Sequence, residues 1–330
     1  MNFEWENLVT EFRKLGGIAD NVYQKEGENG RGIFPVDPTI SSRIFTPSNL
    51  LISPNDIYLE EHKIKIRENS RHSKEISEFF NSYQENLSWG RGGKEAHESF
   101  EKGLSLFPYK LKKLIKDNIL VDIEKRHKSN WNDIILRQFL SARLFSFRNK
   151  SFIVPFLELV NHEVKSLPYL RFANGLSTPN YPSKSCELVH SYGYKSSLNR
   201  LFNYGFFCKE TKVFSFPFQI DLVDIGISLA CKGLELSNDL MKIEKINQTI
   251  IIEGLPIADK NIPSLPKDYI IELFSRLNLK YSPIELLSKI NSMNNIKRKT
   301  IVEELIKLDN YSALLLMQAI NYELGLISKL

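Results

Sequence analysis

Cysteines and long apolar runs are both scarce in this sequence. Cys186, Cys208 and Cys231 are its only cysteines, and none of them forms a Cys-x-x-Cys pair. An odd number of scattered cysteines argues against a disulfide framework and against a structural zinc site. No segment approaches the roughly 18 apolar residues that a membrane helix needs. The first residues mix acidic and apolar side chains, unlike a secretion signal. We therefore expect a cytoplasmic chain without metal or membrane contacts.

The sequence also lacks a large excess of either charge. Its 44 basic and 39 acidic side chains give a formal net charge of +5, whereas a dedicated nucleic-acid binder carries a concentrated basic surface. Short basic clusters occur at residues 110–116 and 297–299, and such runs are typical of solvated helix faces. With 42% hydrophobic residues, the chain has enough apolar side chains for a core. It is expected to fold as a globular protein that binds no nucleic acid.

Apolar periodicity and turn residues predict the order of helices and strands. A helical face at residues 3–15 is followed by strand-like pieces separated by turns rich in Gly, Pro and Ser. Helix-forming sequence begins at about residue 56, strands are predicted at 212–222 and 248–255, and a helical pattern runs from 267 onward. The fold class predicted is α+β. We expect a β-rich first domain at residues 1–212 with a helical insert at about 53–149, and a mainly helical second domain at 213–330.

A turn of glycines and arginine is the first candidate ligand contact. Gly30, Arg31 and Gly32 precede a strand-like segment, and glycines permit positive φ and a close approach of the backbone to a ligand. A dinucleotide-binding fingerprint needs a helix after its glycines, so that reading is disfavoured. An ordinary hairpin turn is the alternative.

Further candidates lie between residues 143 and 205. The apolar run Phe152–Val160 ends abruptly at Asn161 and His162, which are either satisfied core groups or ligand contacts. Tyr192 and Tyr204 each precede a glycine, and each is either a core tyrosine or a side chain directed at a ligand. A helix rich in Leu and Phe is predicted near residues 130–147, and Arg143 lies on its last turns, where it either snorkels or pairs with a carboxylate.

Taken in order, these segments resemble the SET-domain protein methyltransferases of the Rubisco large-subunit methyltransferase type. The resemblance covers roughly residues 16–48 and 140–210, and it rests on four segments: GGIADNVYQKEGENGRGIF, ARLF, VPFLELVNH and SYGYKSSLNRLFNYGFF. They are similar to the family's opening glycine turn, its Ser-Arg-x-Phe segment, its Val-Pro-x-x-Asp-x-x-Asn-His motif, and its Ser-Tyr-Gly segment followed by Tyr-Gly-Phe. The family fold is a β-rich SET domain with a helical insert and a helical C-terminal domain.

The resemblance implies a cofactor and the residues that hold it. S-adenosylmethionine is expected to contact the backbone of Gly30, Arg31 and Gly32, the side chain of Asn161, the backbone of His162, and Arg143 near its carboxylate end. Tyr204 is expected at the methyl-transfer channel, touching the cofactor, with Tyr192 lining the channel. These two tyrosines are the catalytic candidates. No catalytic metal is required.

The function implied is S-adenosylmethionine-dependent methylation of a protein substrate, with lysine as the expected acceptor. A lysine amine has a reference pKa of about 10.4 and must lose a proton before it attacks, and tyrosine hydroxyls in an aromatic channel are suited to orient the neutral amine. Protein-histidine methylation is the alternative reaction. Ala142, Glu158 and Ser197 depart from the family's Ser, Asp and Asn. Ala142 and Glu158 motivate the alternative of a different class, an inactive SET-fold interaction module.

Overall fold

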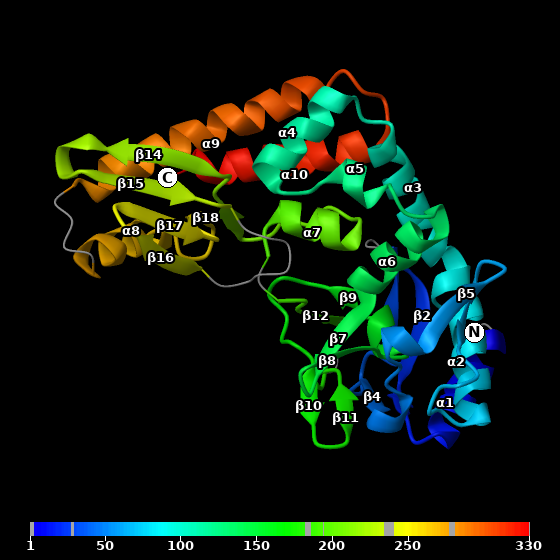
Figure 1. Ribbon diagram of the computed structural model, residues 1–330. Coiled ribbons are helices and arrows are strands. Elements are labelled where there is room, and N and C mark those ends of the chain that lie inside the picture. Colours follow the sequence, from blue (N-terminus) through cyan, green and yellow to red (C-terminus); the bar gives the residue numbers. More distant parts are fainter. Residues whose placement is uncertain are drawn as a thin grey trace. The chain divides into compact units, whose positions relative to one another are not determined.

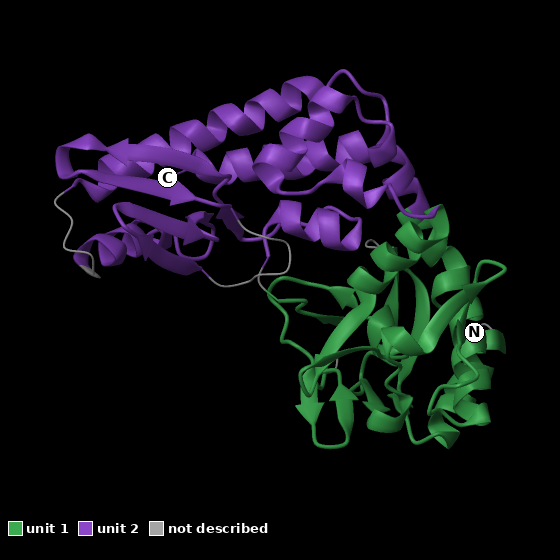
Figure 2. Ribbon diagram, viewed as in Figure 1, with its two compact units in different colours: residues 1–97, 131–193 green, residues 98–130, 194–330 purple. Residues whose placement is uncertain are grey.

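The computed structural model describes residues 3–27, 30–181, 186–193, 195–233, 241–276 and 281–329. Helices and strands are interspersed along the chain, and the last part, from α8 onward, is helical (Figure 1). The predicted α+β class and the helical C-terminal region are therefore confirmed. The chain divides into two compact units, one made of residues 1–97 and 131–193 and the other of residues 98–130 and 194–330 (Figure 2).

The first unit contains short strands and three of the longer helices. Its helices are α1 (Phe3–Lys14), α2 (Lys74–Asn86) and α6 (Trp131–Arg143). Its strands are β1 (Ile18–Asp20), β2 (Val22–Gly27), β3 (Gly30–Pro35), β4 (Arg43–Pro47), β5 (Ile57–Glu60), β6 (Lys63–Ile66), β7 (Leu144–Phe147), β8 (Lys150–Ile153), β9 (Asn161–His162), β10 (Leu170–Phe172), β11 (Gly175–Ser177) and β12 (Val189–His190). The helix α3 (Lys94–Ser105) begins in this unit and ends in the second.

Small sheets in the first unit pack around an aromatic core. Four strands form a sheet in the order β1-β4-β11-β10, while β2–β3, β5–β6 and β7–β8 are antiparallel hairpins and β9 pairs with β12 in parallel. The ring of Phe12 on α1 stacks on that of Phe156 at 4.5 Å between centroids. Tyr83 on α2 lies 5.4 Å from the same ring. The helices α1 and α2, which lie together in Figure 1, thus bury the segment that leads into β9.

The second unit combines a sheet with three long helices. Its helices are α4 (Tyr109–Ile119), α5 (Ile123–Arg126), α7 (Ser197–Tyr204), α8 (Leu265–Arg276), α9 (Pro283–Leu305) and α10 (Tyr311–Ile327). Its strands are β13 (Lys212–Phe214), β14 (Phe218–Leu222), β15 (Ile227–Cys231), β16 (Lys242–Ile246), β17 (Thr249–Glu253) and β18 (Pro256–Asp259). A sheet of order β14-β15-β17-β16 and the pair β13–β18 share one apolar core with α8, α9 and α10.

Several local predictions need correction. The sequence from residue 56 was expected to be helix-forming, yet residues 57–66 form the β5–β6 hairpin, because Ile57, Ile64 and Ile66 alternate into the core. The expected helix at residues 130–147 ends at Arg143 and continues as the strand β7. The strands β15 and β16, between the two predicted ones, and β18, just after the second, were missed. The domain boundary at residues 212 and 213 stays a prediction, since the compact units divide the chain at other positions.

No helix among the described residues is both long enough and apolar enough to cross a membrane.

Candidate active site

The predicted glycine turn and the predicted polar pair meet in the first unit. The side-chain Nδ2 of Asn161 on β9 donates a hydrogen bond of 3.0 Å to the backbone carbonyl of Arg31 on β3. A methyl group added to the next residue, Gly32, would lie 2.8 Å from the same Nδ2. Only glycine therefore lets the side chain of Asn161 lie flat against β3. Two motifs that are far apart in the sequence form one surface.

Backbone geometry differs between the two glycines of the turn. Gly30 has φ +81° and open space around the position of a side chain, so its requirement is conformational. Gly32 is buried and is limited by its neighbours. The β2–β3 hairpin pairs Lys25 with Gly32 and Glu26 with Arg31. The predicted hairpin and the predicted ligand-contacting turn, here called the glycine cradle (Gly30–Gly32), are therefore the same local structure.

Glu187 is a site residue that the sequence reasoning missed. Its Oε1 accepts a hydrogen bond of 2.7 Å from Asn161 Nδ2 and would lie 2.1 Å from a Cβ on Gly32. The carboxylate thus fills the space that Gly32 leaves open. An acidic residue just ahead of a strand-like LVHSY segment has no distinctive sequence pattern, and only the pairing of β12 with β9 brings it to this place.

The second pair of predicted residues meets through β9 and β12. His190 pairs with His162 across the parallel strands, and the backbone N–H of Tyr192 donates to Nδ1 of His162 at 3.1 Å. The rings of His162 and Tyr192 are 5.0 Å apart. The hydroxyl of Tyr192 donates to the carbonyl of Val160 at 2.7 Å. The short parallel ladder holds Asn161 and His162, and the hydrogen bonds to His162 and Val160 hold Tyr192 beside it.

Aromatic rings support this ladder from within the first unit. His190 is buried, and its ring lies 4.7 Å from Tyr192 and 5.5 Å from Phe145. The hydroxyl of Tyr181 donates to the carbonyl of Val189, and burial, with a smaller contribution from Tyr192, raises the pKa of Tyr181. His190 is thus a core histidine that packs behind Asn161, His162 and Tyr192.

Arg143 contacts a buried carboxylate, as one of its two sequence readings predicted. Its Nη1 donates to the carbonyl of Glu158 at 3.2 Å and lies 4.0 Å from Oε2 of that side chain. Glu158 is buried and accepts from Gln84 Nε2 at 3.0 Å. Burial raises the pKa of Glu158, and the charge of Arg143 opposes that rise. The guanidinium of Arg143 also lies over the Phe139 ring at 4.8 Å.

Arg31 links this buried network to the glycine turn. Burial lowers the pKa of Arg31, and the nearby charge of Arg143 lowers it further. Its Nη1 donates to the carbonyl of Leu87 at 3.4 Å, and its Nε is 3.9 Å from a carboxylate oxygen of Glu26. The structure thus brings Arg31, Asn161, His162 and Tyr192 into connected contacts and gives Arg143 an electrostatic connection to them.

Tyr204 belongs to the second unit, where it ends α7. Gly205 caps this helix with φ +76°, and its N–H donates to the carbonyl of Leu201. The guanidinium of Arg200 lies 4.8 Å from the Tyr204 ring centroid, and Arg200 Nε donates to Glu210 at 2.7 Å. Because Arg200 is fully buried, it fixes the end of α7 and with it the ring of Tyr204. Its predicted meeting with the residues of the first unit stays a prediction.

Comparisons with known proteins give structural likeness only. No model of a protein family and no curated protein matches the sequence. The structure is similar to that of the SET domain of LSMT bound to lysine and AdoHcy, with a TM-score of 0.48, 15% identity, and coverage of 99% of this chain and 89% of that chain. For Rubisco LSMT bound to AdoMet the TM-score is 0.49 and the identity 15%, with coverage of 100% of this chain and 91% of that chain. For Rubisco LSMT bound to sinefungin and monomethyllysine the TM-score is 0.47 and the identity 13%, with coverage of 100% of this chain and 90% of that chain. These values are too low to transfer a ligand or a substrate to this chain.

Proposed function

We propose that the protein is an S-adenosylmethionine-dependent methyltransferase of the SET type that methylates lysine in a protein substrate. The observation that carries the proposal is the hydrogen bond from Asn161 to Arg31. It joins the Asn-His segment to the glycine turn, the two segments whose resemblance to SET-domain methyltransferases implies a common cofactor site. Residues 213–330 are proposed to dock the protein substrate.

The donor set around Gly32 fits the cofactor. S-adenosylmethionine carries an α-ammonium group and an α-carboxylate, so its amino-acid end needs both acceptors and donors. The carboxylate of Glu187 and the amide oxygen of Asn161 supply acceptors, and the backbone of Gly30–Gly32 supplies N–H groups, because both N–H groups of Asn161 are donated to Arg31 and Glu187. Glycine at position 32 lets the Glu187 carboxylate lie against β3, because any side chain there would overlap it. The backbone of His162 is proposed to bind the adenine, and Arg143 to lie toward the carboxylate end.

The cofactor supplies an electrophilic methyl group, and the chain supplies position and a channel for the amine. An in-line displacement gains most of its rate from alignment of the two reactants. Tyr204 is proposed to face the incoming amine with its hydroxyl, which accepts a hydrogen bond and so directs the nitrogen lone pair. Tyr192 has its hydroxyl committed to Val160, so its proposed role is to line the channel with its ring. Aromatic faces favour a partly methylated ammonium by about 0.5–2 kcal/mol.

Transfer of a labelled methyl group tests the proposal. Purified protein, isotope-labelled S-adenosylmethionine and a cell lysate are expected to yield a labelled protein band. Tyr204→Phe keeps the ring beside Arg200 and Phe206 but removes the hydroxyl, so labelling should fall by about 100-fold, well beyond any change in cofactor affinity measured by calorimetry. Tyr58→Phe, at a tyrosine of the β5–β6 hairpin, is the matched control. Equal labelling by Tyr204→Phe and the parent would remove Tyr204 from the mechanism.

The labelled product also separates the alternatives. Hydrolysis to amino acids is expected to release methylated lysine, whereas methylated histidine would establish the other reaction. The buried contact of Glu158 with Arg143, at a position where the family has aspartate, favours the inactive interaction module as the second candidate. Absence of S-adenosylmethionine binding by calorimetry, together with a stable partner in a pull-down, would establish that module instead.

A further inference from the structure

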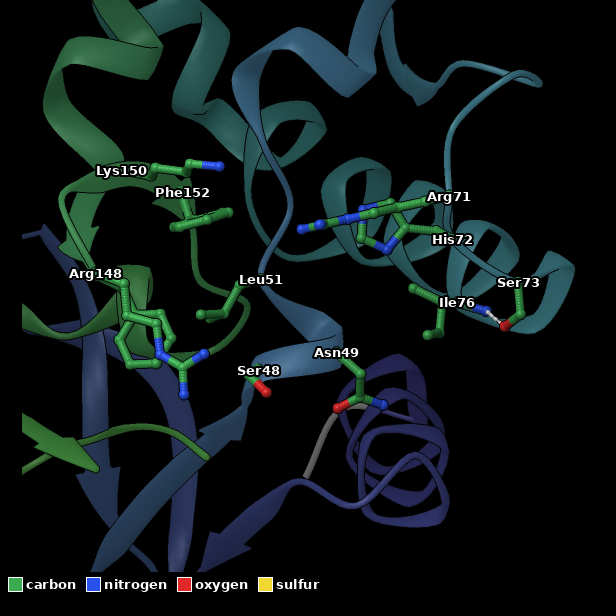
Figure 3. Close-up of a pocket in the computed structure, with 11 residues that line it drawn as sticks. Ser48, Asn49, Leu51, Arg71, His72, Ser73, Ile76, Arg148, Lys150 and Phe152 are labelled. Carbon is green, nitrogen blue, oxygen red and sulfur yellow. Dashed lines mark hydrogen bonds between the residues drawn. The ribbon is translucent and has the colours of Figure 1, made fainter. Parts of the chain in front are cut away.

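A cavity of about 660 Å³ lies in the first unit, lined by residues of three segments between Ser48 and Phe152. It shares no lining residue with the candidate active site. Arg71, Arg148 and Lys150 contribute positive charges to its walls, and no Asp or Glu lines it. Figure 3 shows Arg71 and Lys150 extending toward the space from opposite sides. The cavity is therefore positive on two facing walls.

The charges on these walls are not neutralised within the protein. Across the described ranges, no ion pair joins Arg71, Arg148 or Lys150 to a carboxylate. Among the lining residues, His72 contacts an acid, since its Nε2 lies 3.4 Å from Oδ2 of Asp56. Burial lowers the pKa of His72, and the charge of Asp56 opposes that shift. Binding of an anion is electrostatically favourable between cations that face one another without a counter-ion.

Polar donors and apolar groups complete the lining. Ser48, Asn49 and Ser73 place hydroxyl and amide groups at the cavity, and Leu51, Ile76 and Phe152 form apolar parts of its wall. The Ser73 hydroxyl accepts from the N–H of Ile76 at 3.3 Å, and Arg148 is held by the carbonyl of Ala173. The volume lies within the range of small-molecule sites, about 300–1,000 Å³.

We propose that this cavity binds a small phosphorylated metabolite, with its phosphate between Arg71 and Lys150. Phosphate is favoured over a single carboxylate because two cations, Arg71 and Lys150, extend toward the same space, and because arginine binds phosphate through two parallel hydrogen bonds. A small molecule is favoured over a phosphorylated protein segment because the cations stand on facing walls and the volume is that of a compact ligand. The proposal does not rest on methyltransferase activity.

Calorimetry with inorganic pyrophosphate and with AMP tests the proposal on the full chain. Submillimolar binding of at least one probe is expected, unaffected by saturating S-adenosylmethionine. The double variant Arg71→Gln/Lys150→Gln should bind about tenfold or more weakly. Arg71 and Lys150 are exposed, so the variant should fold, and thermal unfolding checks this. Lys14→Gln, an exposed cation of the same unit outside the cavity, should bind like the parent.

Two results overturn the proposal. One is the absence of binding by the parent to either probe at millimolar concentration. The other is equal affinity of the parent and the double variant, which would place the anion elsewhere. A phosphoserine peptide serves as a third probe, and its binding without binding of pyrophosphate or AMP would reject the small-molecule ligand. Because none of these readouts involves methyl transfer, they are independent of the labelling experiment.

Discussion

The side-chain amide of Asn161 donates a hydrogen bond to the backbone carbonyl of Arg31, a residue that is 130 positions earlier in the chain. The same nitrogen donates to the carboxylate of Glu187. Asn161 thus joins β3 to the segment that precedes β12. Substitutions at this junction are the most direct tests of the candidate site.

Asn161→Ala should weaken S-adenosylmethionine binding by about 10- to 100-fold, the value of a hydrogen bond to a charged group. The substitution also leaves the carboxylate of Glu187 without its amide donor. Binding is measured by calorimetry, and unfolding by denaturant shows whether the fold persists. Asn55→Ala removes an exposed asparagine of the same unit and is the control. Unchanged affinity in Asn161→Ala would exclude this amide from the cofactor site.

Gly32→Ala should reduce cofactor affinity by about tenfold or more. A Cβ at this position would lie 2.1 Å from Oε1 of Glu187, and because that atom ends a flexible side chain, Glu187 turns away and its hydrogen bond with Asn161 is lost. Gly30→Ala is a contrasting change, because the added Cβ would meet no atom within 4 Å. Alanine would instead have to adopt φ +81°, which costs about 1–2 kcal/mol of stability. Gly325→Ala in α10 has open space and should leave cofactor binding intact. Equal cofactor affinity in Gly32→Ala and Gly325→Ala would contradict the cradle.

The sequence indicated which residues gather at the candidate site, but not every contact between them. Gly30, Gly32 and Asn161 were recognisable because glycines in a turn and a polar pair after an apolar run are local patterns. Glu187 was not recognisable, because its role depends on the parallel pairing of β12 with β9, and no local pattern specifies which distant strands pair.

The same distinction explains the fold. Long amphipathic segments such as α10 were predicted because their apolar spacing is local. The strand β16 was missed because Lys242, Glu244 and Lys245 make it charged and exposed, and only its pairing with β17 holds it extended. Within the predicted helical region, α9 continues through a polar stretch, because the buried Asn294 bonds to Ile290 and Phe216 within the unit.

Glu158→Gln should flatten the pH dependence of stability. Burial raises the folded-state pKa of Glu158 above its ordinary value of 4.5, so between the two values the native state binds more protons than the unfolded state. The free energy of unfolding of the parent then falls as pH rises through that window. The substituted amide has no proton to lose, while its oxygen can still accept from Gln84. Denaturant unfolding at several pH values measures the difference, with Glu68→Gln, at an exposed carboxylate, as control. Parallel profiles for parent and Glu158→Gln would contradict the prediction.

Glu323→Ala should destabilise the second unit by about 3–5 kcal/mol, the cost of leaving a buried charge without its partner. Glu323 and Arg298 have side chains that are each 1% exposed, and they form an ion pair of 2.9 Å between α10 and α9. Glu323 Oε1 also accepts from the N–H of Leu198 at 3.2 Å, so the same carboxylate holds α7, the helix that ends at Tyr204. Loss of the acceptor should therefore speed amide exchange at Leu198.

The paired substitution Arg298→Met/Glu323→Leu distinguishes a buried-charge penalty from a loss of packing. Because it removes both charges and keeps apolar volume, it should recover most of the stability lost in Glu323→Ala. Glu303→Ala, on the exposed face of α9, should change the free energy of unfolding by about 0.5 kcal/mol or less. Denaturant unfolding measures all three variants. A paired variant as unstable as Glu323→Ala would contradict this prediction. The ion pair would then be stabilising in its own right, because the geometry of α9, α10 and α7 would depend on its hydrogen bonds rather than on neutralisation of a buried charge.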